Sequence, residues 1–402
     1  MARIAHADVV IVGAGIAGLM AANALTAQGR RVIVVEKGPR VGGRLSTEAI
    51  GPGRADSGAQ FFTARSDTFR DYVARWMDAG LVFEWSLGWS DGSLGATPPT
   101  GHPRYAVRGG MSALAEHLAR GSDVRLDTWI VSAMPDASGW IVCDQDGVVC
   151  AADALLLTPP VPLALDMLEG GDTQIAPADR AALAQIEYSP CLAGIFWVNG
   201  TVQLPEPGAV QRPNATITWI ADNRSKGITG DATLITVHAG PGYSHELWSL
   251  PDQAALSALA SGLNLFKEMK TEIIEGRLKR WRYATPVTSH PARHLLAQGL
   301  PPLAFAGDAF SGPRVGALLT HASLPPRWGP RAGARSAAGH PRGRAPLALQ
   351  ERVHLALGVR QRVADRRLVG GLWRALARDR RDRHIGDTAR WARRLARHAR
   401  RP

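Results

Sequence analysis

The sequence contains few cysteines and no long apolar run. Cys143, Cys150 and Cys191 are the only cysteines in 402 residues, and none has metal-ligand spacing. We therefore predict no metal site and expect reduced, cytoplasmic thiols. No apolar run approaches the ~20 residues that span a bilayer, and no separate apolar segment precedes a signal cleavage site. With 45% hydrophobic and 20% charged residues, the chain is predicted to be globular with two or three domains.

Positive charge is concentrated at the C-terminal end. Residues 314–402 contain 22 arginines, no lysine and five acidic residues, a net +17 that leaves −5 for the rest of a chain of net +12. We expect the Arg-rich tail, residues 321–402, to be disordered or loosely helical, since Pro325 and Pro326 cannot continue a helix. Three interpretations stay open: a reading-frame change in a GC-rich gene, a genuine solvated extension, or a basic arm. Tryptophans are sparse there, so we expect no specific nucleic-acid binding and at most nonspecific, salt-sensitive polyanion binding.

A β-α-β pattern opens the chain. The β-branched run at 9–12 predicts a strand buried on both faces, and the run at 32–35 predicts a second strand that ends at Glu36. Between them, the glycine motif at 13–18 starts a helix. In such a unit the first glycine permits the tight turn, the second lets a pyrophosphate approach, and the third allows close packing. The predicted dinucleotide contacts are Gly13, Gly15, Ile16, Ala17, Gly18 and Glu36; the alternative is a glycine turn in an ordinary α/β domain.

Two further segments resemble FAD-binding sequences of two-domain flavoproteins. The first ends in Gly42-Gly43-Arg44, and the resemblance implies that Arg44 meets the cofactor's phosphates, with Lys37 and Gly43 nearby. The alternative is a surface turn with a solvated arginine. The second is a short apolar strand that ends in Gly307 and Asp308, and the resemblance implies a bond from this aspartate to the ribityl or pyrophosphate portion. Because no cysteine follows Cys191, FAD linked to a C-terminal thiol is excluded and we expect non-covalent FAD.

The segment from Asp56 to Arg65, with Gly58-Ala59-Gln60-Phe61-Phe62, resembles the renalase-like group of the flavin amine oxidase superfamily. The sequence Gly-Met-Ser-Ala at 110–113 also resembles this group. The resemblance covers roughly residues 8–315. It implies FAD contacts from Ala59, Gln60, Val131 (near a strand at 129–131) and Val315. In relatives an acid follows that last position and opens a helix whose N-terminus points at the flavin. The acid is missing here.

The same likeness implies an α/β, two-domain flavoprotein: a Rossmann-type FAD-binding domain and a mixed, largely antiparallel β-sheet substrate domain. We assign residues 1–70, 105–160 and 300–320 to the FAD-binding domain, and 71–104 and 161–299 to the substrate domain. Predicted helices lie at 67–79, from 112, and at 178–186. Short strands are predicted within 124–157, and further strands at 192–198, 216–221 and 232–238.

Substrate-binding candidates come from the second domain: Arg224, His238, Trp281 and Tyr283. Trp281 and Tyr283 alternate along a predicted strand, so both can face one side; the alternative is a core or sheet-face pair. His238 at a strand end is equally compatible with a purely structural histidine. Arg224 and Lys226 could draw a phosphate-bearing substrate, or they could lie in a solvated loop.

No Ser-His-Asp grouping, carboxylate pair or zinc spacing stands out, so the catalytic residues stay unknown. This absence is compatible with flavin hydride chemistry, which needs no base. The likeness implies an FAD-dependent oxidoreductase that oxidises 2- or 6-dihydro isomers of NAD(P)H, with O2 as the electron acceptor and hydrogen peroxide as product. Two alternatives are a flavin amine oxidase of a small amine, and a nucleotide- or polyanion-binding protein without turnover, in which the interrupted C-terminal helix prevents catalysis.

Overall fold

The computed structural model describes residues 4–93 and 101–310, all within the unit Met1–Ala332. Val315 and the Arg-rich tail lie outside the described residues. Within the described ranges, no helix combines the length and apolar character needed to cross a membrane. The three cysteines are free thiols.

The first layer is an eight-stranded sheet. Its central strands are β1 (Ala5–Val12), β2 (Val32–Val35), β7 (Asp123–Arg125), β10 (Val148–Leu157) and β17 (Leu303–Phe305), in the parallel order β7-β2-β1-β10-β17. The short strand β16 (Leu295–Leu296) pairs antiparallel with β17. The strands β8 (Ser132–Asp136) and β9 (Gly139–Cys143) form a hairpin that extends from β10.

Both faces of this sheet are covered, as the apolar run of β1 predicts. Val9 and Ile11 pack into one core with helices α1 (Ile16–Ala27), α2 (Asp67–Asp78) and α3 (Ser112–Ala119). Val10 and Val12 point the other way, because successive side chains of a strand alternate. They pack into a second core with the β8–β9 hairpin and helices α4 (Val161–Gly170) and α5 (Pro177–Ala184). The predicted β-α-β unit is therefore confirmed.

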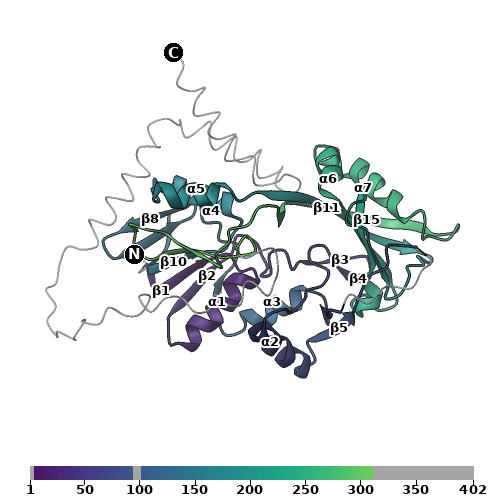
Figure 1. Cartoon of the computed structure of the whole chain (residues 1–402), viewed down its shortest axis with the longest axis horizontal. Coiled ribbons are helices and arrows are strands. Elements are labelled where there is room, and N and C mark those ends of the chain that lie inside the picture. Colours follow the sequence, from purple (N-terminus) through teal and green to yellow (C-terminus); the bar gives the residue numbers. More distant parts are fainter. Residues whose placement is uncertain (1–3, 94–100, 311–402) are drawn as a thin grey trace, which may run out of the picture. The chain divides into compact units, whose positions relative to one another are not determined.

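The second layer is a five-stranded antiparallel sheet in the order β12-β13-β14-β11-β15. The strands are β11 (Tyr188–Asn199), β12 (Ala209–Gln211), β13 (Ile217–Asp222), β14 (Thr233–Ala239) and β15 (Glu272–Pro286). Helices α6 (Pro241–Leu247) and α7 (Asp252–Ala260), with the 3-10 turn η2 (Ser261–Leu263), cover one face of β11 and β15 (Figure 1). A 3-10 turn, η1 (Asn223–Lys226), joins β13 to β14.

Two hairpins link the layers: β3 (Thr47–Ile50) with β4 (Gly53–Asp56), and β5 (Val82–Ser86) with β6 (Arg104–Val107). Ile50 and Ala55 pack against Ile195 and Leu234 of the second sheet. The hairpin of β5 and β6 and the loop after β5 place Trp85 and Trp89 against Trp219. The two-domain α/β architecture predicted from the sequence is confirmed.

The packing moves two of the predicted domain boundaries. Helices α4 and α5 belong to the core of the first sheet, so the change of layer comes after α5 and not after residue 160. Helix α2 likewise packs on the first layer through Phe69, Val73 and Trp76. Each helix has one apolar face, and that pattern does not specify which sheet the face covers.

Candidate active site

The glycine motif forms a tight turn between β1 and α1. Gly13 has φ +100°, a conformation that favours glycine. A Cβ on Gly18 would lie 2.0 Å from the Gly13 carbonyl oxygen, so only glycine allows this helix–strand approach. A Cβ on Gly15 would meet no heavy atom within 4 Å, and no side chain caps α1 at this residue. The open space at the uncapped helix start fits the pyrophosphate of a dinucleotide.

Glu36 follows β2 and turns back to the glycine motif. Its Oε2 accepts a hydrogen bond from the Ala14 amide at 2.9 Å, and its Oε1 accepts one from the Gly38 amide at 3.0 Å. A carboxylate can accept about four hydrogen bonds, so capacity is left for ribose hydroxyls. The cofactor contact predicted for the neighbouring Lys37 stays a prediction.

Val131 lies in a different environment from the one expected. The strand predicted at 129–131 is wrong, because β8 begins at Ser132. The Val131 amide donates to the Cys143 carbonyl at 2.9 Å, and its carbonyl oxygen is packed against Gly170. An adenine contact through this backbone N–H is therefore not available, and any contact from Val131 must be made by other atoms.

The early and late motifs meet at the carboxyl ends of the parallel strands. Gly13 and Gly307 both lie against Thr158, which follows β10. Gly42 donates to the Ala14 carbonyl at 2.8 Å, and a Cβ on Gly43 would lie 3.6 Å from the Gly15 Cα. Ligands of open α/β sheets bind in the crevice outside the carboxyl ends of such strands. The geometry therefore brings the predicted cofactor motifs to one place.

Arg44 and Asp308 form a bidentate ion pair across this crevice. Arg44 Nη2 donates to Asp308 Oδ1 at 2.8 Å, and Nη1 donates to Oδ2 and to the carbonyls of Tyr283 and Ala284. Burial opposes the charge of Arg44, but the carboxylate outweighs it and the pKa of Arg44 is raised. The alternative of a solvated surface arginine is wrong. Arg44 ties the first layer to β15, and its phosphate contact remains a proposal.

The segment Ser57–Gln60 lies directly beside Arg44. Ala59 donates to the Arg44 carbonyl at 2.8 Å, and a Cβ on Gly58 would come within 2.1 Å of the same oxygen. Gln60 is buried, and its Nε2 donates to the carbonyls of Asp56 and Gly58 at 2.8 and 3.1 Å. This backbone passes so close to its neighbours that only glycine fits at 58 without a shift.

The second sheet meets Ser57–Gln60 with two of the predicted substrate residues. Trp281 Nε1 donates to the Ser57 carbonyl at 2.8 Å. His238 also lies next to the Ser57 backbone, and its Nε2 is buried with no hydrogen-bond partner among the described residues. Burial and the charge of Lys226 lower the pKa of His238 to about 4, so the ring is neutral at pH 7. His238 is paired in register with Trp219 and Ala193, and directly paired residues share one sheet face.

The other two substrate candidates differ from these. Tyr283 makes an edge-on contact with Tyr188, with ring centroids 5.5 Å apart, beside the Arg44–Asp308 pair. Burial, with the charge of Asp308, raises the pKa of Tyr188. Arg224 is exposed and pairs with Asp222 at 3.1 Å, whereas Lys226 is buried.

Sequence reasoning missed the role of Tyr188, which packs on Tyr283, and misplaced Lys226. Lys226 neither lies in a solvated loop nor is free to draw a phosphate, because it is buried and bound to Asp56 and Gln60. The one indirect signal was that Lys226 is one of only five lysines in the chain. Its partner lies 170 positions earlier, beyond any local pattern.

Comparisons with known proteins agree with this architecture. A model of an NAD(P)-binding Rossmann-like domain matches residues 11–76, and the model of the flavin containing amine oxidoreductase family matches residues 77–317. A putative flavin-containing monoamine oxidase, AofH, of Mycobacterium tuberculosis is 50% identical over 60 residues, 15% of this chain and 13% of that protein. The flavin-dependent L-tryptophan oxidase RebO of Lentzea aerocolonigenes is 29% identical over 148 residues, 35% of this chain and 31% of that protein. The chain thus matches less than a third of either relative's length.

Among solved structures, putrescine oxidase bound to putrescine is similar over 80% of this chain and 98% of its own, with a TM-score of 0.59 and 15% identity, which shows the shared fold. The narrower likeness to the renalase-like group stays a prediction. The second family model covers more than half of the chain and includes the crevice at Asp308. The chain therefore belongs to the flavin containing amine oxidoreductase family of FAD-dependent enzymes.

Proposed function

We propose that this protein oxidises 2- or 6-dihydro isomers of NAD(P)H, with O2 as the electron acceptor. Bound FAD would supply the redox chemistry by accepting a hydride at N5 and passing two electrons to O2. Per turnover, the dihydropyridine, O2 and one proton give NAD(P)+ and hydrogen peroxide. The pyridine becomes aromatic as the hydride leaves, so no protein base has to remove a proton.

The cofactor-binding roles proposed for this chain follow the crevice. The uncapped start of α1 (Gly15, Ile16, Ala17, Gly18) would bind the pyrophosphate and Glu36 the ribose. Asp308, oriented by Arg44, would accept from a hydroxyl of the cofactor. Gly58, Ala59 and Gln60 would form the wall against the flat ring. These roles remain proposals for each residue.

The observation that carries the substrate assignment is the neutral His238. Its Nε2 is buried and has no hydrogen-bond partner among the described residues. In a neutral ring this nitrogen either donates or accepts a hydrogen bond, according to the tautomer. A buried polar atom without a partner is unfavourable until a ligand supplies one. The carboxamide of a nicotinamide carries both a donor N–H and an acceptor carbonyl, and Trp281 beside His238 offers an aromatic face.

The charges near His238 also favour this substrate over a cationic amine. The charge of Lys226, which is paired with Asp56, disfavours a positive charge on His238. The ammonium of Lys279, which is paired with Glu48 at 3.3 Å, lies 5.1 Å from the centre of the Trp281 ring. Both of the side chains proposed to meet the substrate therefore already have an ammonium group nearby, which would weaken binding of a second, substrate ammonium there.

Oxidation of a small amine is the second candidate, and family membership favours it. The relatives include proteins named monoamine oxidase and putrescine oxidase. Tyr188 and Tyr283 could flank an amine, although here they contact each other edge-on. Amine oxidation would release ammonia as a product.

An anaerobic reduction assay separates the two candidates. FAD-loaded protein is mixed with 2-dihydro, 6-dihydro and ordinary 4-dihydro NADH, and in parallel with putrescine, a monoamine and L-tryptophan, while the flavin band near ~450 nm is followed. We expect bleaching by the 2- and 6-dihydro isomers, with NAD+ and no ammonia. Bleaching by an amine with release of ammonia, while the isomers leave the band unchanged, would overturn the proposal in favour of amine oxidation.

A further inference from the structure

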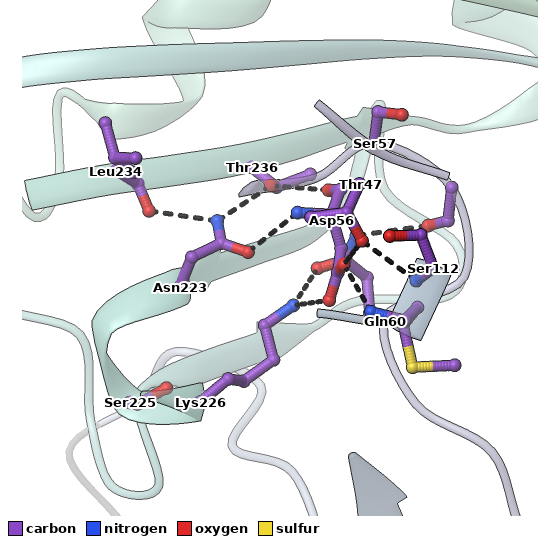
Figure 2. Close-up of polar contacts among 12 residues, drawn as sticks. Thr47, Asp56, Ser57, Gln60, Ser112, Asn223, Ser225, Lys226, Leu234 and Thr236 are labelled. Carbon is purple, nitrogen blue, oxygen red and sulfur yellow. Dashed lines mark hydrogen bonds and ion pairs between the residues drawn. The ribbon is translucent and has the colours of Figure 1, made fainter. Parts of the chain in front are cut away.

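A buried lysine, Lys226, contacts Asp56 and Gln60, which lie at the two ends of the segment around Ser57 (Figure 2). Lys226 Nζ lies 2.8 Å from Asp56 Oδ2 and 3.0 Å from Gln60 Oε1, and both ion-pair side chains are 1% exposed. The ammonium also lies 5.3 Å from the centre of the Trp85 ring. Lys226 thus joins η1 of the second layer to the end of β4 in the hairpin that links the layers.

Asp56 is the centre of the network. Its Oδ1 accepts from Thr47 Oγ1 at 2.6 Å and from the Met111 amide at 2.8 Å, and its own amide donates to Asn223 Oδ1 at 3.1 Å. Its carbonyl accepts from Thr236 Oγ1 at 2.8 Å. The charge of Asp56 is therefore compensated by two hydrogen-bond donors as well as by Lys226, and its backbone is bonded to Asn223 and Thr236.

Asn223 closes the network from the same turn as Lys226. Its Nδ2 donates to the Leu234 carbonyl and to Thr236 Oγ1, both at 2.9 Å. The side chains of the network are all buried and hydrogen-bonded: Thr47, Asp56, Gln60, Asn223, Lys226 and Thr236. Such a network fixes one geometry, since any shift leaves a buried polar group without a partner.

Stability alone does not account for an ion pair in this position. Taking two charges out of water costs several kcal/mol each, and an apolar pair of the same volume is often as stable. The network instead contacts the segment Ser57–Gln60 of the candidate site. Gln60, fixed by Lys226, bonds the Gly58 carbonyl. The adjacent Ser57 carbonyl accepts from Trp281.

We propose that Lys226 is a positioning residue for the flavin and its substrate: through Asp56 and Gln60 it fixes Ser57–Gln60 between Arg44 and the second sheet. Because burial and, after it, the charge of Lys226 lower the pKa of His238, the titration of His238 reports on loss of this ammonium. This inference rests on the function proposed above. The segment contacts Arg44 on one side and Trp281 on the other, so its position sets the distance between the cofactor crevice and the substrate-facing sheet.

Three variants test this role: Lys226→Met, the double variant Asp56→Asn with Lys226→Met, and Lys270→Met. Lys270 is exposed in the second layer and serves as the matched control for loss of an ammonium. Each variant is measured for bound FAD, flavin absorption spectrum, melting temperature and the His238 titration followed by NMR. KM and kcat for the dihydropyridine are measured in parallel.

We expect Lys226→Met to lower the melting temperature and to weaken FAD binding at least tenfold, because Asp56 loses its counter-charge. The double variant removes both charges, so it should regain most of the melting temperature. It should nevertheless keep an altered flavin spectrum, a raised KM and a His238 titration shifted upward, since Gln60 and His238 have still lost Lys226. Lys270→Met should match wild type in all measurements.

A double variant with wild-type FAD affinity, spectrum, KM and His238 titration would overturn the proposal, because the pair would then only stabilise the fold. Failure of both Lys226 variants to fold, with Lys270→Met folded, would overturn it equally. The FAD and NMR measurements need no turnover. If they shift as expected while wild type leaves the dihydropyridines unchanged, the positioning role stands and the proposed substrate is wrong.

Discussion

Two ion pairs lie where the two layers of this molecule meet, and they differ in their access to water. Arg44 and Asp308 are 30% and 17% exposed, at the carboxyl ends of the parallel strands. Lys226 and Asp56 are 1% exposed and surrounded by a closed hydrogen-bond network. A pair that reaches water can exchange a hydrogen bond with a ligand at little cost, whereas a buried pair cannot. We therefore propose ligand contact for the first pair and a positioning role for the second.

Asp56→Ala should have the largest effect, because it leaves Lys226 buried and unpaired. We expect the free energy of unfolding of the FAD-free protein to fall by about 3–5 kcal/mol. Urea denaturation measures this, with Asp231→Ala, an exposed residue before β14, as the control. A loss below about 1 kcal/mol would mean that the buried pair is not the constraint described here.

Gly58→Ala should have the next largest effect, since this glycine lies between the two pairs. The new Cβ would lie 2.1 Å from the Arg44 carbonyl oxygen, so the segment must move at a cost of about 2–4 kcal/mol. We expect loss of bound FAD along with a lower melting temperature. Gly242→Ala is the control, because a Cβ there meets nothing within 4 Å. Equal FAD content in the two variants would contradict the close approach.

Acid should weaken the fold through His238. The folded pKa is about 4, below the ordinary 6.5, so the unfolded chain binds the proton more readily. Stability is therefore present above pH 6.5 and falls as the pH drops toward 4, by about 1–3 kcal/mol. The His238→Asn variant should show a flatter dependence in denaturation series across this range. An identical slope would indicate that His238 titrates normally.

Arg44→Met should have the smallest effect on stability and a selective effect on the cofactor. Its partner Asp308 keeps some contact with water, so we expect a loss of about 1 kcal/mol in unfolding free energy. FAD binding should weaken about tenfold or more, with a salt dependence smaller than that of wild type. Fluorescence titration with FAD at two salt concentrations measures both. Unchanged FAD affinity would leave Arg44 as a structural tie alone.

The local parts of the fold could be predicted because the signal is local. Apolar runs and glycine spacing specified β1, α1 and β2, and the predicted helix at 67–79 corresponds to α2. Ser66 begins that helix by accepting from the Phe69 amide. The strands predicted at 192–198, 216–221 and 232–238 correspond to β11, β13 and β14.

Contacts between distant segments could not be predicted in the same way. The pairing of Lys226 with Asp56, and the use of Arg44 by the β15 carbonyls, depend on how two sheets pack. The assignment of α4 and α5 to the second domain failed because an apolar helix face does not identify the sheet that it covers. The resemblance brought Arg44 and Asp308 to one cofactor, but it did not predict that they contact each other.

The most direct test of the account is the visible spectrum and flavin content of the purified full-length chain. We predict absorption bands near ~370 and ~450 nm, with about one FAD per chain that denaturation releases unmodified. That result would mean that the crevice between Gly15 and Asp308 holds the cofactor non-covalently. A colourless protein that also fails to take up added FAD would contradict the central claim, and the sequence from position 315 onward would then be the first region to verify.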